Sequence, residues 1–511
     1  MNFPPPPRRA GPLPIDPDDP RHMAWLTLGF IALHLLVWTL LPALSHRAPP
    51  WDNIEQLVWT QSLQWGYYKH PPAPTWWMVF WTELLGRQVW VTFLAAQLSV
   101  AGMLLCVWRI ALMVTTPLRA FISVVLTALV AYHGLRGIMA NHNTLQLLPV
   151  GLLLWALLGA VRAPPQGAAR WWLWAAAGAA GALCMLSKYS ALVWFAMAGL
   201  WLLLEPRMRS LRAWGPVLLG AAVCLALLGP HIAWMVQSDF ATLRYAQDSF
   251  ENSGPDTAGL PGYWADLWFF TTAQLGRLAP ALIALGVLRW WLRRAPAAPL
   301  PGPDGERLFV RLLGLGGMHL ASSWATTFFV LAGLLLLRWV PTVAPARLLG
   351  ATLAVGLAAQ LLLAGGLALG RGVLVDQLGR NARSNFPAPA MAQALQQVWR
   401  QHARTPLRVL AGETWLAGNL SIHLPSQPLV FIDAEPRHAP WIDTAALPRC
   451  DLLVVVDRSP DAPAPSAQTL QLLARASAHG QLSVPWTSQP GGPQLTVDWG
   501  IVPATQPGCA Q

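Results

Sequence analysis

The sequence predicts a mainly α-helical, polytopic membrane protein with a bundle of about eleven transmembrane helices, interfacial helices in the first outer loop and a small C-terminal α/β soluble domain. Three observations predict this class. The 511 residues are 54% hydrophobic. Only 11% are charged, whereas soluble domains carry roughly 25%. Apolar runs approaching the roughly 20 residues that a spanning helix needs recur along most of the chain. Together these exclude a disordered chain, a disulfide scaffold and a soluble enzyme with a single core.

The apolar runs divide the chain into a cytoplasmic proline-rich tail at 1–22, a transmembrane domain at 23–370 and a C-terminal extracytoplasmic domain at 371–511. No signal-peptide pattern precedes the first run, so we expect it to be an uncleaved span. The segment 309–321 is short and could merge with the next run, which would reverse the orientation of everything after it. The expected spans lie at 23–44, 89–113, 118–134, 144–161, 172–187, 189–204, 213–236, 266–292, 309–321, 325–340 and 348–370.

The basic residues set the expected orientation. The net charge is +11, and of 34 basic side chains only Lys69 and Lys188 are lysines. With the N-terminus inside, the inner loops hold most of the arginines, as the positive-inside rule requires. The outer side then receives the loops 45–88 and 237–265 and the C-terminal domain. Because the arginines are scattered between apolar runs, we expect no nucleic-acid partner.

The outer segments have different characters. Loop 45–88 is rich in Trp and Tyr, and its helical stretches at 54–65 and 75–85 are typical of interfacial helices. The C-terminal domain shows helical patterns at 390–402 and 468–478 and buried-strand patterns at 407–410, 429–433 and 452–457. We find no catalytic or metal motif in it.

The ionisable residues of loop 45–88 suggest chemistry. Asp52 and Glu55 are three residues apart, so a helix places both on one face. Lys69 and His70 follow in the same loop. A carboxylate beside cations suits a transfer reaction, in which one group takes a proton and the others stabilise an anionic leaving group. The alternative is structural: Asp52 caps a helix, and Lys69 and His70 contact lipid headgroups.

Four motifs carry a family resemblance. They are Asp52-Asn53-Ile54-Glu55 with Trp65-Gly66-Tyr67-Tyr68-Lys69-His70-Pro71-Pro72, then Asn141-His142-Asn143, Leu186-Ser187-Lys188-Tyr189-Ser190, and Pro230-His231-Ile232-Ala233-Trp234. In their order they resemble the family 39-type polytopic glycosyltransferases of the GT-C superfamily, which are related to protein O-mannosyltransferases and to the aminoarabinose transferase of lipid A. The resemblance covers roughly residues 23–370.

The resemblance implies a glycosyltransferase that moves a sugar, with inversion, from a polyprenyl-phosphate donor lipid to a lipid, glycan or protein acceptor. It implies a bacterial inner membrane location, with the active site and the C-terminal domain facing the periplasm. Asp52, with Glu55 beside it, is the expected catalytic carboxylate. The expected donor-phosphate residues are Lys69, His70, Lys188 and Arg277. The expected substrate contacts are Tyr67, Tyr68, Asn141, His142, Asn143, Tyr189 and His231.

The sequence also departs from the family pattern. Asn53 stands where relatives usually carry Glu, Lys69 where they usually carry Asp, and Asn143 where they often carry Asp. Because divalent metals need carboxylate or imidazole ligands, we expect a metal-independent enzyme without cofactors, with a divalent cation as the open alternative. Two other functions stay open: a transporter or flippase for the lipid-linked sugar, and a non-catalytic relative. The absence of an internal repeat and the crowding of ionisable groups in one outer loop favour the enzyme.

Overall fold

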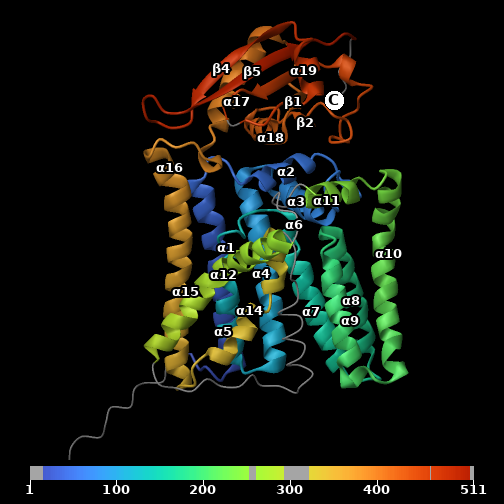
Figure 1. Cartoon of the computed structure of the whole chain (residues 1–511), viewed down its shortest axis with the longest axis vertical. Helices are drawn as coiled ribbons and strands as arrows, with labels where there is room; N and C mark the ends of the chain where they lie inside the picture. The colour runs from blue at the N-terminus through green and yellow to red at the C-terminus, as the bar shows by residue number, and fades with distance from the viewer. Residues whose placement is uncertain (1–14, 252–259, 293–321, 461, 507–511) are drawn as a thin grey trace, which may run out of the picture.

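The computed structural model describes residues 15–251, 260–292, 322–460 and 462–506. It is a bundle of helices with the C-terminal domain stacked on one end (Figure 1). The bundle helices are α1 (Pro20–Ser45), α4 (Val89–Val114), α5 (Pro117–Ala128), α6 (His142–Leu145), α7 (Leu147–Arg162), α8 (Ala168–Ser187), α9 (Ala191–Leu204), α10 (Gly215–Gln237), α12 (Leu260–Trp291), α14 (Ala332–Leu336), α15 (Pro345–Leu367) and α16 (Leu374–Gln377). The outer segments add α2 (Trp51–Trp59), α3 (Ala73–Leu85) and α11 (Ala241–Glu251).

Among the described residues, six helical segments are long and apolar enough to cross a membrane. They are Pro20–Ser45, Val89–Val114, His142–Arg162, Leu211–Gln237, Trp268–Trp291 and Pro345–Gln377. Shorter apolar helices occupy Pro117–Ala128, Ala191–Leu204 and Ala325–Trp339. The mainly helical class is therefore confirmed, whereas the described helices are less uniform than eleven full spans. The expected span 309–321 lies outside the described residues.

Two expected spans are wrong as continuous helices. The segment 118–134 is helical only to Ala128, after which the chain turns, and 325–340 consists largely of short 3₁₀ turns around α14. Added Cβ atoms would lie 2.6 Å from the Trp38 ring at Gly134 and 2.5 Å from the His133 carbonyl oxygen at Gly137. The turn thus depends on glycines at close approaches. Apolar composition alone does not distinguish such a buried turn from a helix.

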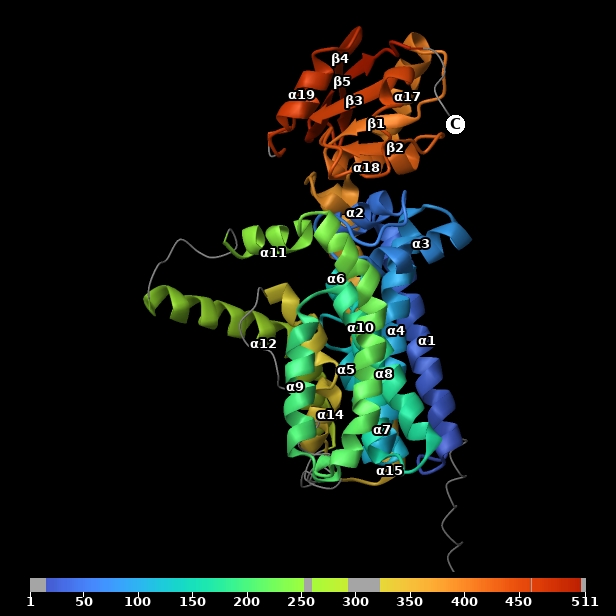
Figure 2. The same cartoon turned by 90° about the vertical axis from the view of Figure 1, so that its right-hand side faces the viewer.

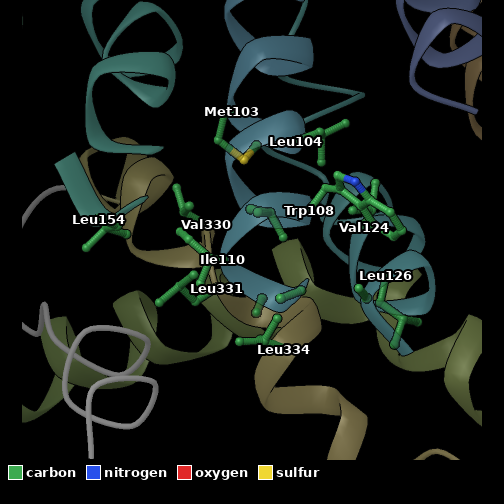
Figure 3. Packing of buried hydrophobic residues seen from close by; sticks show 14 of the residues in the cluster. Met103, Leu104, Trp108, Ile110, Val124, Leu126, Leu154, Val330, Leu331 and Leu334 are labelled. Carbon is green, nitrogen blue, oxygen red and sulfur yellow. The ribbon is translucent and has the colours of Figure 1, made fainter. Parts of the chain in front are cut away.

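Small residues set the spacing of the bundle. A Cβ at Gly178 of α8 would lie 2.0 Å from the carbonyl oxygen of Gly220 in α10, so only glycine lets these two helices approach so closely. A large apolar core joins the helices of the bundle, and residues of α4, α5, α7 and α14 meet within it (Figure 3). Figure 2 shows that α12 runs obliquely to the other long helices, at about the level where α9 begins.

The two helices of the first outer loop differ in environment. In α3, Phe80 and Leu84 are exposed, as an interfacial helix requires. By contrast, the expectation of an interfacial position is wrong for α2, whose residues from Asn53 to Trp59 are buried. Its apolar face packs against the C-terminal domain: a Cβ at Gly418 would lie 2.5 Å from Ile54. The apolar pattern is the same whether lipid or protein covers a helix.

The C-terminal domain is built on a five-stranded sheet with strand order β2-β1-β3-β5-β4. β1 pairs in parallel with β2 and β3, while β5 runs antiparallel to β3 and β4. Helix patterns at 390–402 and 468–478 correspond to α17 and to a shorter α19. The elements are α17 (Ala388–His402), β1 (Val409–Gly412), α18 (Thr414–His423), β2 (Leu429–Ile432), β3 (Leu452–Asp457), α19 (Ala467–Leu473), β4 (Ala478–Pro485) and β5 (Gln494–Val502).

Candidate active site

Asp52 lies in the first turn of α2, at the end of the bundle that carries the C-terminal domain (Figure 1). Its Oδ2 accepts a hydrogen bond of 2.7 Å from the side-chain amide of Asn141. Asn141 is itself fixed, because its Oδ1 caps α6 by accepting from the backbone N–H groups of Asn143 and Thr144. The carboxylate is therefore held in one direction by a residue that another helix end keeps in place.

Asn53 holds α2 against the bundle. Its Nδ2 donates to Thr92 Oγ1 at 2.8 Å and to the Ile138 carbonyl at 3.0 Å, and its Oδ1 accepts from the Ala140 N–H at 2.9 Å. The side chain is fully buried. An ionised Glu at this position would have no donor for the first two bonds. The departure from the family pattern thus has a structural cause.

Glu55 and Lys69 form an ion pair of 2.6 Å between α2 and the segment that follows it. Both side chains are largely enclosed. Burial disfavours the charged ammonium of Lys69, but the charge and hydrogen bond of Glu55, together with Tyr68 and Tyr245, outweigh this effect, and the pKa of Lys69 is raised. Burial raises the pKa of Glu55, and Lys69 opposes the rise. Lys69 also lies over the rings of Tyr68 and Tyr245, at 5.2 and 5.7 Å.

Lys188 follows the last residue of α8 and points into the same site. Its Nζ donates a hydrogen bond of 2.7 Å to Asn143 Oδ1. Gln146 Nε2 donates to the Lys188 carbonyl, which fixes the backbone there. Burial lowers the pKa of Lys188 to about 7, against the opposing effect of the Asp52 carboxylate. Asn141 holds Asp52 and Asn143 accepts from Lys188, and both asparagines lie at the start of α6, so the carboxylate and the ammonium lie beside the same helix end.

A cluster of aromatic rings packs against the residues of the site. The Trp59 ring stacks on Tyr67 at 5.0 Å and meets His142 edge-on at 5.9 Å. His70 lies against His142 with ring centroids 3.8 Å apart. Burial, with Lys188 and Lys69 adding to it, places the pKa of His70 well below its usual value, so this imidazole is neutral near pH 7. Tyr67 is buried and donates to the Ser62 carbonyl, which makes it an anchor.

Tyr189 and His231 lie on the flank of the site. His231 Nδ1 donates to the Trp65 carbonyl at 2.6 Å, so its Nε2 accepts from the Tyr189 hydroxyl at 2.9 Å. Thr242 of α11 then donates to Tyr189 at 2.8 Å. This network ties the segment around residue 65 to α10 and α11.

Arg277 lies one layer behind the site. Its guanidinium is 5.9 Å from the Tyr132 ring centre, and Tyr132 lines a small cavity with Asn141 and Asn143. The structure therefore brings Asp52, Glu55, Lys69, His70, Tyr68, Asn141, His142, Asn143 and Lys188 together, with Arg277 behind them.

Sequence reasoning missed three aromatic residues that contact the expected site residues. Tyr132 contacts Arg277, Tyr245 contacts His70, and Trp59 contacts His142. These contacts form between residues far apart in the chain, so no motif spacing predicts them. Within the part of the chain that the structure describes, no three His, Cys, Asp or Glu side chains form a potential metal site.

Comparisons with known proteins identify what this chain resembles. Residues 69–234 match the family described as dolichyl-phosphate-mannose-protein mannosyltransferase. The lipid A galacturonosyltransferase RgtD of Rhizobium johnstonii is 24% identical over 307 residues. That match covers 57% of this chain, and the chain spans only 60% of the relative's length.

The fold is also shared with a solved structure. ArnT from Cupriavidus metallidurans bound to undecaprenyl phosphate superposes with a TM-score of 0.59 at 16% identity, over 93% of this chain and 98% of ArnT. Its apo form gives 0.55 at 15% identity, over 94% and 98%. Together the family match, the relative and the shared fold confirm the resemblance to the family 39-type membrane glycosyltransferases of the GT-C superfamily that the motifs indicate.

Proposed function

We propose that this protein is an inverting glycosyltransferase that moves a sugar from a polyprenyl-phosphate donor to an acceptor at the periplasmic face of a bacterial inner membrane. The observation that carries the proposal is the Asp52 carboxylate, which Asn141 orients at 2.7 Å, together with the Lys188 ammonium, which the neighbouring Asn143 holds at 2.7 Å. The names of the relatives support a lipid-linked donor, and that of RgtD supports a lipid A-type acceptor as the first to test.

The reaction that fits this geometry is a direct displacement. Asp52 accepts the proton of the acceptor hydroxyl as that oxygen attacks C1 of the sugar. The bond between C1 and the phosphate oxygen breaks, its electron pair stays on the phosphate, and polyprenyl phosphate leaves. Attack from the face opposite the leaving group inverts C1. A cation beside the phosphate stabilises the charge that develops there.

Lys188 is the better placed of the two lysines for the phosphate. Lys69 is paired with the Glu55 carboxylate, whereas Lys188 contacts the neutral amide of Asn143, two residues from the Asn141 that holds Asp52. We assign Lys69 and Glu55 to the support of the site, together with Tyr67 and His142. Neutral His70 can donate a hydrogen bond to the phosphate. The reaction as proposed uses no metal ion or other cofactor.

The test compares glycolipids and glycoproteins, by mass spectrometry, from cells that lack the protein with those that express it or its variants. Asp52→Asn keeps the size of the side chain but removes the base. We expect it to abolish the sugar modification while the purified variant still binds undecaprenyl phosphate. Glu83→Gln, an equal charge change at an exposed position of the same outer loop, is the matched control and keeps the modification.

The assignment of the base fails if Asp52→Asn cells carry the modification at the wild-type level. The transferase itself fails if the wild-type protein changes neither the glycolipids nor the glycoproteins.

A further inference from the structure

The edge strand β2 of the C-terminal sheet lies along loop 45–88, and residues beyond its carboxyl end also contact that loop. Glu413 follows β1 directly and Asp433 follows β2, and the two strands are parallel neighbours. In open α/β sheets, ligands bind outside the carboxyl ends of the strands. Asp433 and Ala434 both adopt positive φ, 54° and 53°, which Asp tolerates but which is strained for Ala. Such strain is common where a fold must place a side chain for function.

A chain of contacts leads from this edge into the site. The His438 ring stacks on Tyr68 with 4.2 Å between centroids and 22° between planes. His438 Nδ1 also lies 3.6 Å from Asp433 Oδ2. Tyr68 in turn lies beneath the Lys69 ammonium, which pairs with Glu55. Along this chain each side chain restricts the conformations available to the side chain that it contacts.

The domain is fixed to the loop by more than this stack. Trp415 of α18 stacks on Trp51 at 5.8 Å, nearly parallel. Gln61 Oε1 accepts from the Val430 N–H at 2.9 Å, at the start of β2. Buried residues of α2 and of α18 belong to one apolar cluster. A domain packed in this way can impose a position on the loop, which a tethered domain cannot do.

We propose that Asp433 and His438 are positioning residues of the active site, which hold Tyr68 so that the segment Tyr67–His70 keeps Lys69 in place on Glu55. The proposal rests on the proposed transferase function for its kinetic consequence. It makes the carboxyl edge of the C-terminal sheet a wall of the site, although its residues do not touch the reacting atoms.

The experiment compares His438→Ala with His438→Phe, which keeps the stack. His402→Ala is the control, because His402 is exposed and packs on Trp499 of the same domain. The first readout is hydrogen exchange of the Tyr67 and His70 amides, which donate to each other's carbonyl groups at 3.0 and 3.1 Å. We expect His438→Ala to speed this exchange by about tenfold or more, with amides of α4 unchanged.

The second readout is the kinetics of transfer in nanodiscs, with undecaprenyl-phosphate galacturonic acid as the probe donor and lipid A as acceptor. We expect His438→Ala to lower kcat by about tenfold with little change in KM for the donor, because binding groups stay and alignment is lost. His438→Phe restores both readouts, and His402→Ala changes neither. Wild-type exchange in His438→Ala, or a loss that Phe does not rescue, overturns the proposal.

Two further comparisons keep the result unambiguous. If His438→Ala fails to fold, Asp433→Asn replaces it, since Asn tolerates positive φ and only the charge is lost. It should shift exchange in the same direction by a smaller factor, and wild-type exchange would overturn the proposal. Exchange needs no substrate, so it decides the positioning role even if the wild-type protein transfers no sugar, an outcome that counts against the transferase instead.

Discussion

Lys188 allows a quantitative prediction, because its charge should change within an easily accessible pH range. Burial lowers its pKa to about 7, whereas an ordinary lysine stays protonated to about pH 10. A bound phosphate favours the ammonium form. Phosphate affinity should therefore be highest well below pH 7 and decline as the pH rises through that value.

The size of the effect follows from the protonated fraction. With a pKa of about 7, this fraction falls from about 76% at pH 6.5 to about 3% at pH 8.5, so affinity should fall roughly 25-fold, about 1.9 kcal/mol. The probe is the methyl ester of undecaprenyl phosphate, whose single charge does not titrate in this range. Its dissociation constant is measured by thermophoresis with the protein in nanodiscs.

Matched variants isolate Lys188 from other groups. Lys188→Arg should bind without this pH dependence, because a guanidinium keeps its charge throughout. Lys188→Gln should bind weakly at both pH values. Burial raises the pKa of Glu413 to about 7, so Glu413→Gln measures that background. If the wild-type protein shows the same pH dependence as Lys188→Gln, Lys188 does not bind the phosphate.

Two other substitutions probe the charge pattern of the site. Lys69→Met should lower the free energy of unfolding by up to about 3 kcal/mol, since it leaves the Glu55 carboxyl buried without its cation, and Glu55→Gln added to it should recover part of the loss. Chemical denaturation in detergent measures both, and equal stability of single and double variants would contradict the pairing. Asn143→Asp should weaken phosphate binding at pH 6.5 by about tenfold, because the new carboxylate would bind the Lys188 ammonium. Unchanged affinity in the same thermophoresis assay would place Lys188 elsewhere during binding.

Much of the site could be predicted because membrane-spanning helices end at two common levels, and the residues next to the ends at one level lie near one another. Asp52, Asn141 and Lys188 come from separate segments, each beside an apolar run. Because successive spans alternate in direction, these three residues are expected on the same side of the membrane, and this expectation needs no information about how the helices pack. Their hydrogen bonds, Asp52 with Asn141 and Lys188 with Asn143, agree with that reasoning.

Other parts depend on packing that no local pattern encodes. His438 lies 370 residues from Tyr68 in the chain, within a domain whose sequence shows no catalytic motif. The helical pattern at 468–478 predicts that Ala478 ends a helix, whereas the structure begins β4 there. The residues of β4 alternate only between half-buried and exposed, so the apolar alternation typical of a strand is weak. Sequence patterns report the burial of a segment, and they do not identify what buries it.

The three departures from the family pattern gain a common explanation from their partners. Asn53 uses its amide donor and acceptor in three buried hydrogen bonds, Lys69 pairs with Glu55, and Asn143 accepts from Lys188. Relaxed selection would leave buried polar groups without partners, and each lone group costs about 1–3 kcal/mol. Here each changed side chain meets a group of matching charge or hydrogen-bonding type. That correspondence argues for a functioning site in which a lysine, flanked by an asparagine, works beside the carboxylate that we propose as the base, and against a degenerate relative.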